Sequence, residues 1–377
     1  MKKTVLMLLK IVVSLGILTY IFTKVIDVRH LWANLREADV SFIIAGILVY
    51  FLVQTLSAWR WYLLVKPQGI EISFSKILAY YFLGMYFNFF LPSAIGGDVF
   101  KVYYLNKETG RLSASTASVF FDRDIGMGGL LLVATFVSLM AGTRTHGDTG
   151  ILLGPVFGLI AIAFIAANLA LFYRPTYNVL HRLLAAFRLK EADEKIQRLF
   201  DSVNAYRGKW GLITTAMLMS VGVQVGCVFV NMLAANAIGM HTRGGWIDYL
   251  VFIPTIGLIG MVPLSMNGTG WREASYIILF SLVIDSIGAN ASPTLDQKQT
   301  AAATLSFLWL GILVITSLPG GIVYVARGGR KASPPPADGE ALEEKSLVKV
   351  SAGNKRPDDH VSNISGAAQE EEPVSMI

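Results

Sequence analysis

The chain has 377 residues, of which 54% are hydrophobic and only 15% are charged, whereas an average soluble domain carries about 25% charged residues. Its mean hydropathy is +0.54, and its apolar residues come in blocks of about 20, the length of helix that crosses roughly 30 Å of hydrocarbon. This composition excludes an ordinary soluble globular protein. It predicts an all-α polytopic membrane protein.

The chain carries 32 Lys and Arg against 26 Asp and Glu, a net charge of +6. The basic residues flank the apolar blocks and do not line one polar face interleaved with aromatic residues, so we expect anionic lipid and no nucleic acid as partner. The single cysteine, Cys227, excludes a disulfide framework and a cysteine-based zinc site, and the five His residues lack metal-ligand spacing. We therefore predict neither a metal site nor a cofactor.

The first apolar block, residues 4–25, follows Met-Lys-Lys, which is how a signal peptide begins. The block is longer than a signal peptide needs and lacks a cleavage site between small residues, so we predict a retained membrane span. Residues 27–41 then alternate apolar and charged side chains at helical spacing. This pattern is typical of a short helix that lies in the membrane interface.

Further apolar blocks predict full membrane spans, which brings the expected number of clear spans to six. These further blocks are residues 42–65, 113–140, 151–173, 210–238 and 300–325. Arg60 stands between Trp59 and Trp61 in the first of them. We interpret this arrangement as an anchor at the membrane interface.

Two polar segments set the expected orientation in the membrane. Residues 174–209 hold eight Lys and Arg against four acidic residues, and the positive-inside rule places such a segment in the cytoplasm. After residue 326 the chain changes to a Pro-Pro-Pro run, acidic runs and few aromatic residues. We expect a transmembrane domain over 1–326, a disordered tail over 327–377, and both termini in the cytoplasm of a cell inner membrane.

Residues 74–110 and 246–287 each contain an apolar run, a Pro and Gly break, a charged cluster and a second apolar run. If the first segment crossed the membrane completely, the cationic stretch at 174–209 would fall outside the cell, against the charge bias. We therefore predict two broken re-entrant helical hairpins that enter from opposite faces. Together with six full spans they would form an inverted repeat with its breaks near the bilayer midplane.

The first break contains Pro92, Gly96 and Gly97, and then Asp98 as the expected N-cap of the helix that follows. A helix N-terminus buried in a membrane offers unpaired N–H groups and partial positive charge, which suit a phosphate or carboxylate. Lys101, one turn further on, adds a full cation. The alternative is that Asp98 only caps the helix and Lys101 faces cytoplasmic water.

The second break repeats this logic, with Asn267 or Thr269 as the expected helix cap. Charged residues at such a depth cost at least about 2.5 kcal/mol each, so they must pair, face water or meet a ligand. The planar fork of Arg272 matches a phosphate, although a purely structural ion pair is the alternative. The candidate binding residues of this break are Asn267, Gly268, Gly270, Arg272 and Glu273.

A third charged cluster, Asp122, Arg123 and Asp124, lies inside the predicted span 113–140. Glycines follow it at 126, 128 and 129 and would allow another helix to approach closely. Asp122 and Arg123 therefore either brace a neighbouring helix or contact a ligand directly.

Three strings in this order, PSAIGGDVFKVYYL, SVFFDRDIG and PLSMNGTGWREA, resemble the lysylphosphatidylglycerol synthase transmembrane, or flippase-like, family of prokaryotic membrane proteins. The resemblance covers residues 1 to about 326 and implies an inner-membrane protein that handles lipid head groups or lipid-linked saccharides. It carries over to Pro92, Gly96, Asp98, Asp122, Arg123, Pro263, Asn267, Gly268, Gly270, Arg272 and Glu273. Lys101 stands where we expect Arg in many members. The soluble aminoacyl-transferring domain of full-length synthases has no counterpart here, so we do not expect lysyl transfer.

The leading hypothesis is a lipid translocase in which Arg272, Arg123 and Lys101 neutralise an anionic phospholipid or lipid-linked head group at the midplane. The sequence has no G-x-x-x-x-G-K-[ST] motif for ATP, so uphill transport would draw on an ion gradient or a partner. One alternative is a membrane-embedded transferase with Asp98 or Glu273 as base. The other is an accessory subunit of a lipid-modifying enzyme. We assign no catalytic residue, because no nucleophile-base set or metal cluster defines a reaction.

Overall fold

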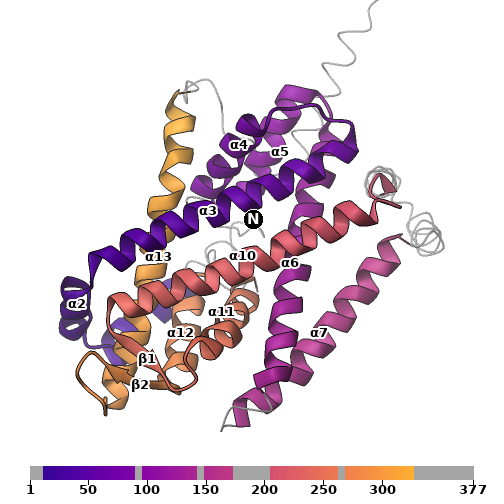
Figure 1. The fold of residues 1–377 in the computed structure, drawn as a ribbon. Coiled ribbons are helices and arrows are strands. Elements are labelled where there is room, and N and C mark those ends of the chain that lie inside the picture. The colour runs from indigo at the N-terminus through magenta and orange to yellow at the C-terminus, as the bar shows by residue number, and fades with distance from the viewer. Residues whose placement is uncertain (1–11, 90–95, 142–147, 173–203, 262–267, 327–377) are drawn as a thin grey trace, which may run out of the picture. The chain divides into compact units, whose positions relative to one another are not determined.

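The computed structural model describes residues 12–89, 96–141, 148–172, 204–261 and 268–326. All of them belong to one unit, Met1–Pro335, and they are almost entirely helical (Figure 1). The predicted all-α class is confirmed. The expected tail, most of the cationic stretch 174–209, and the break residues Pro92, Pro263 and Asn267 lie outside the described residues.

The N-terminal part of the described chain is a helix over Val12–Val25, whose last turn, Ile21–Val25, is a π-helix (η1). The predicted short helix follows as α2 (Val28–Glu37). Asp27 caps it, because its carboxylate accepts hydrogen bonds from the backbone N–H groups of Arg29 and His30.

Five long helices form close to the predicted spans, with ends that differ from the prediction by a few residues. They are α3 (Val40–Val65), α6 (Leu112–Ala141), α7 (Asp148–Phe172), α10 (Trp210–Ala237) and α13 (Leu295–Ala326). The 3-10 turn η2 (Lys66–Gln68) extends α3. Among the described helices, three are both long and apolar enough to cross a membrane, namely Val40–Gln68, Trp210–Ala237 and Leu295–Ala326. With 30 residues, α6 has the length but carries the charged cluster at 122–124.

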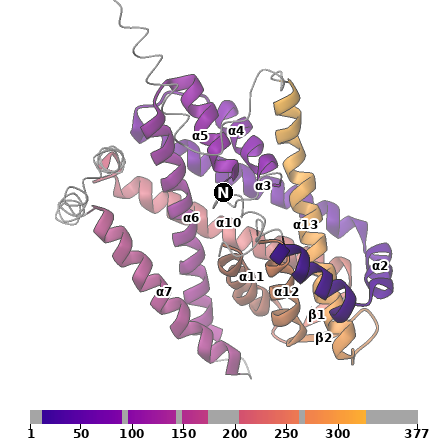
Figure 2. The same ribbon diagram turned by 180° about the vertical axis from the view of Figure 1, so that it is seen from behind.

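Both predicted hairpins are present and consist of short helices. They pair α4 (Phe74–Phe87) with α5 (Gly96–Thr109), and α11 (Trp246–Met261) with α12 (Trp271–Ser281). These helices have 14, 14, 16 and 11 residues, so at 1.5 Å per residue none covers roughly 30 Å of hydrocarbon. Figures 1 and 2 show α4 and α5 near one end of α13, and α11 and α12 toward its other end.

The two helices of the first hairpin approach each other through glycine. A side chain on Gly97 would collide with the carbonyl oxygen of Gly84, and a Cβ on Gly84 would lie 2.7 Å from the oxygen of Gly97. The backbone N–H of Gly97 donates to Oδ1 of Asn88 at 2.7 Å. Phe87 and Phe100 stack with ring centroids 3.9 Å apart. These contacts fix α4 and α5 as one unit.

Small residues also allow close packing between the long helices, as is common in membranes. A Cβ on Gly320 of α13 would collide with the carbonyl of Phe82 in α4. Likewise, Gly129 of α6 lies against Ser220 of α10, as the glycines after the charged cluster predict. The largest apolar cluster lies among α3, α10, α11, α12 and α13.

The sequence did not predict a small antiparallel ribbon. Its strands are β1 (Met240–Thr242) and β2 (Ile284–Ile287), and Met240 pairs with Ile287. The second hairpin therefore ends at Ser281, not at 287. Strands this short lack a readable period of two residues, so hydropathy gives no signal for them.

Candidate functional site

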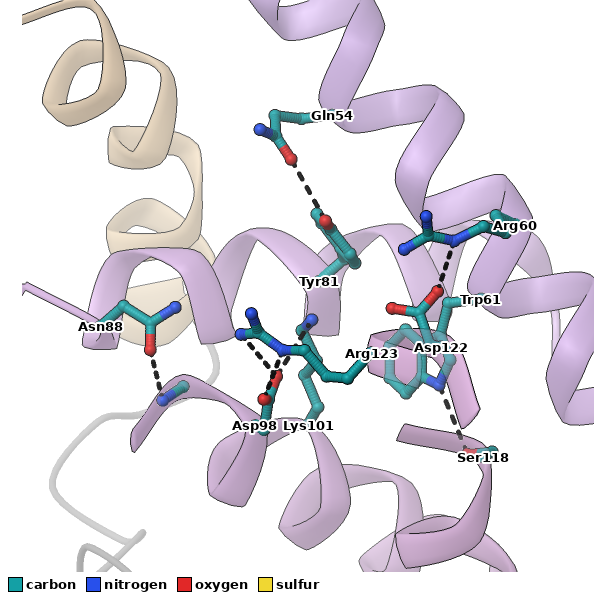
Figure 3. Close-up of polar contacts among 11 residues, drawn as sticks. Gln54, Arg60, Trp61, Tyr81, Asn88, Asp98, Lys101, Ser118, Asp122 and Arg123 are labelled. Carbon is teal, nitrogen blue, oxygen red and sulfur yellow. Dashed lines mark hydrogen bonds and ion pairs between the residues drawn. The ribbon is translucent and has the colours of Figure 1, made fainter. Parts of the chain in front are cut away.

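Asp98 of the first hairpin binds two cations, Lys101 of the same helix and Arg123 of α6 (Figure 3). Its Oδ2 accepts from Nε of Arg123 at 2.6 Å and its Oδ1 from Nη2 of Arg123 at 3.1 Å. The Nζ atom of Lys101 lies 3.3 Å from the same Oδ1. The predicted N-cap role of Asp98 is wrong, because α5 already begins at Gly96 and the carboxylate is engaged by these cations.

Lys101 is enclosed by aromatic rings. Its Nζ lies 4.1 Å from the ring centroid of Tyr81 and 5.6 Å from that of Trp61, and only 7% of its side chain is exposed. The alternative in which Lys101 faces cytoplasmic water is therefore wrong. Aromatic faces and one carboxylate stabilise this cation, although Asp98 is already shared with Arg123.

Arg60 is buried, and its predicted role as an interfacial anchor is wrong. Its Nε donates to Oδ1 of Asp122 at 2.8 Å and its Nη1 to Oγ of Ser220 at 2.7 Å. Arg60 is only 6% exposed. This group joins α3, α6 and α10, so Asp122 has the bracing role that was one of its two alternatives.

In the second hairpin, Gly270 is the N-cap of α12, with φ of 84°; the expected caps, Asn267 and Thr269, are wrong. Oε2 of Glu273 reaches back to the backbone N–H of Gly270 at 2.6 Å. Its Oε1 accepts from Nη2 of Arg272 at 2.7 Å. The Glu273 side chain is 1% exposed and that of Arg272 is 15% exposed, so a buried carboxylate and a mostly buried cation pair at the start of the helix.

The pairing of Arg272 is incomplete. Its Nε is buried and has no hydrogen-bond partner among the described residues. A buried donor without an acceptor costs about 1–3 kcal/mol. An acceptor oxygen supplied by a ligand would remove this cost.

A cavity of about 330 Å³ is lined by residues of both hairpins. Its wall combines residues of α3, α4, α5, α6, α10 and α13 with Met261 and Arg272 from the second hairpin. Lys101 and Arg123 line the same cavity. The three cations that we predicted around a head group thus share one space, whose volume lies in the range of small-molecule sites.

Of the other predicted site residues that the structure describes, Asp122 also lines the cavity, and the rest lie outside its wall. Asp98 and Glu273 hold the cations that line the cavity. Gly96 and Gly97 are buried at the start of α5, and Gly268 and Gly270 adopt positive φ at the start of α12.

Further polar side chains in the cavity wall were not among the predicted site residues, namely those of Gln54, Ser57, Arg60, Asn88 and Gln224. Gln54 accepts from the Tyr81 hydroxyl at 3.2 Å. These residues could have been noticed in the sequence because they are polar side chains within apolar segments, where burial of a polar side chain in the membrane costs free energy.

Residues 7–297 match the profile of the family described as lysylphosphatidylglycerol synthase TM region. The chain belongs to this family. The resemblance found in the sequence motifs is thereby confirmed, and the chain is a membrane protein with helical spans. The match is to the transmembrane region of the synthases.

The chain is also similar to archaeal proteins named UPF0104 membrane proteins. It is 21% identical to one from Methanothermobacter thermautotrophicus over 291 residues, which cover 73% of this chain and 84% of the relative. It is 34% identical to one from Pyrococcus horikoshii over 92 residues, 24% of this chain. It is 29% identical to one from Methanocaldococcus jannaschii over 108 residues, 28% of this chain. The last two matches span only 28% and 30% of those relatives.

Proposed function

We propose that this member of the lysylphosphatidylglycerol synthase transmembrane family is a lipid translocase. An anionic phospholipid or lipid-linked head group binds in the cavity near the bilayer midplane, and the two hairpins open it in turn to either leaflet. The observation that carries this proposal is the shared cavity, to which one hairpin supplies Lys101 and the other supplies Arg272. Arg123 of α6 stands on the same wall.

The donors of the cavity suit a phosphate. Arg272 has an unpartnered Nε among the described residues, and guanidinium groups bind phosphate oxygens with two parallel hydrogen bonds. Arg272 is the second residue of α12, so the positive end of that helix dipole lies at the cavity wall. Together these groups favour an anion.

The carboxylates are less suited to general base chemistry, which favours translocation over transfer. Asp98 accepts from Arg123 with both oxygens, and Lys101 lies beside it. Glu273 likewise has one oxygen on Arg272 and the other on the backbone N–H of Gly270. Both oxygens of each carboxylate are therefore already occupied by donors.

Charge distribution supports an orientation in a cell inner membrane. Around η2 and the ends of α4, α5 and α10 lie Lys66, Lys76, Lys107, Arg111, Arg207 and Lys209, beside Glu71 and Glu108. Contacts such as that of Arg111 with the Gly69 carbonyl hold this end together. Around the opposite ends lie Asp27, Glu37, Asp39, Asp248, Asp285 and Asp296, beside Lys24, Arg29, Arg36, Arg243 and Lys298. The positive-inside rule assigns the first end to the cytoplasm, and we propose that both termini lie on the same side of the membrane.

Leaflet exchange in proteoliposomes tests the proposal. The probes are head-group-labelled phosphatidylglycerol, phosphatidylcholine and a polyprenyl-linked sugar, and the variant is Arg272→Ala. Arg243→Ala is the matched control, because Arg243 forms an exposed ion pair with Asp285 on the ribbon. We expect exchange of the anionic probe by the wild type and by the control, and its loss in Arg272→Ala. Undiminished exchange by a folded Arg272→Ala protein would refute the role of the cavity.

A further inference from the structure

The ionic groups at the cavity do not balance. Among the described residues, the ionic groups that line the cavity or pair with one of its cations are four cations and three carboxylates: Arg60, Lys101, Arg123 and Arg272, and Asp98, Asp122 and Glu273. The site therefore holds one more positive charge than negative charge.

The surplus positive charge lies at Asp98. Arg60 and Asp122 pair one to one, and Arg272 and Glu273 do the same. Asp98, by contrast, is a single carboxylate that faces two cations.

Of the two cations at Asp98, Arg123 presents the charge to the cavity. Its side chain is 47% exposed, whereas that of Lys101 is 7% exposed. Because Arg123 also lines the cavity, a ligand there reaches its guanidinium group directly. Lys101 supports it from behind, against the rings of Tyr81 and Trp61.

The rest of the polar wall is uncharged. Gln54, Asn88 and Gln224 line the cavity, and the side chain of Gln224 has no hydrogen-bond partner within the described part of the chain. Amide groups both donate to and accept from hydroxyl groups. The three described carboxylates at the cavity are all held by cations, so none of these three is left to bind an ammonium group.

We propose, on the basis of the proposed function, that the site selects a phosphodiester with one net negative charge whose head is an uncharged polyol or sugar. Such a group neutralises the surplus charge and offers hydroxyls to the amides. A zwitterionic head leaves the surplus charge in place and brings an ammonium without a partner. A phosphomonoester or a diphosphate carries more negative charge than the one surplus positive charge of the site. The excess negative charge would then be buried without a partner.

Equilibrium binding to the purified full-length protein in detergent tests this selection independently of transport. Two probes are monoanionic phosphodiesters, dihexanoyl phosphatidylglycerol and a short polyprenyl phosphoglucose, and they distinguish a glycerolipid from a lipid-linked sugar. Three probes carry other charges: dihexanoyl phosphatidylcholine, dihexanoyl phosphatidic acid and the corresponding polyprenyl diphosphoglucose. We expect at least one monoanionic probe to bind about tenfold or more tightly than each of these three.

Variants show whether the surplus charge is responsible. Lys101→Gln removes the surplus positive charge and should abolish the preference for the monoanion over phosphatidylcholine. Lys101→Arg keeps the charge and should keep the preference. Arg123→Gln provides the same test if Lys101→Gln does not fold. Lys76→Gln is the matched control, since Lys76 pairs with Glu108 and does not line the cavity, and it should bind as the wild type does.

The outcomes separate this inference from the proposed function. Equal affinity for all probes, tighter binding of phosphatidic acid or diphosphoglucose, or an unchanged preference in a folded Lys101→Gln protein would overturn the inference. If exchange occurs without head-group preference, the inference fails and the translocase stands. If monoanions bind selectively but no exchange occurs, the inference stands and the translocase fails.

Discussion

The buried pair of Arg60 and Asp122 provides the sharpest test of how the charged cavity is built. Nε of Arg60 lies 2.8 Å from Oδ1 of Asp122, and the two side chains are 7% and 4% exposed. Asp122→Leu leaves the Arg60 guanidinium buried, with Ser220 as its one remaining hydrogen-bond partner among the described residues. Removal of one member of such a pair costs about 3–5 kcal/mol, because the remaining charge is uncompensated.

The double variant Arg60→Met with Asp122→Leu removes both charges. It should recover most of the loss, since apolar replacements of a buried ion pair are often neutral, and it should fall short of the wild type by about 1 kcal/mol for the hydrogen bond to Ser220. It removes one charge of each sign, so it also leaves the surplus charge of the cavity unchanged.

Thermal unfolding in detergent, followed by fluorescence-detected gel filtration, measures these effects. At roughly 2–4 °C per kcal/mol, Asp122→Leu should lower the apparent melting temperature by roughly 10 °C, and the double variant by a small part of that. Equal losses in the single and double variants would contradict the reasoning, because the cost would then arise from packing and not from unpaired charge.

Two further predictions concern helix contacts and helix caps. Gly320→Ala should destabilise the protein by about 1–3 kcal/mol, because its Cβ would collide with the Phe82 carbonyl. Gly311→Ala on the same helix should not, because a Cβ there would meet no atom of a neighbouring element among the described residues within 4 Å. Comparable melting shifts for both variants would contradict the close contact. The hydroxyl and then the backbone N–H of Ser41 lower the pKa of Asp39, the N-cap of α3, so its contribution to stability is present above about pH 4 and is lost as the pH falls through the lowered pKa. Asp39→Asn should therefore lose less stability below about pH 4 than the wild type does when acid unfolding is measured. An identical dependence of stability on pH in this range for both proteins would refute the capping role.

The helical segments could be read from the sequence because a membrane restricts what a chain can do. Every backbone polar group must be satisfied within the segment, so an apolar block of about 20 residues is a helix. The ends of α10, at Trp210 and Ala237, accordingly fall within a residue of the prediction. The two hairpins followed from Pro and Gly breaks combined with the charge bias of the loops.

The charged partners could not be read in the same way. Arg60 and Asp122 are 62 residues apart and Asp98 and Arg123 are 25 residues apart, so their meeting depends on how each helix is rotated about its axis. A helix that is apolar on all sides gives little indication of that rotation. The sequence by itself therefore determined the helices, the two broken hairpins and the residues that carry charge. Only the tertiary structure decided that Asp98 is shared by two cations, that Arg60 is paired and buried, and that Arg272 reaches the same cavity, because contacts between distant helices set these positions.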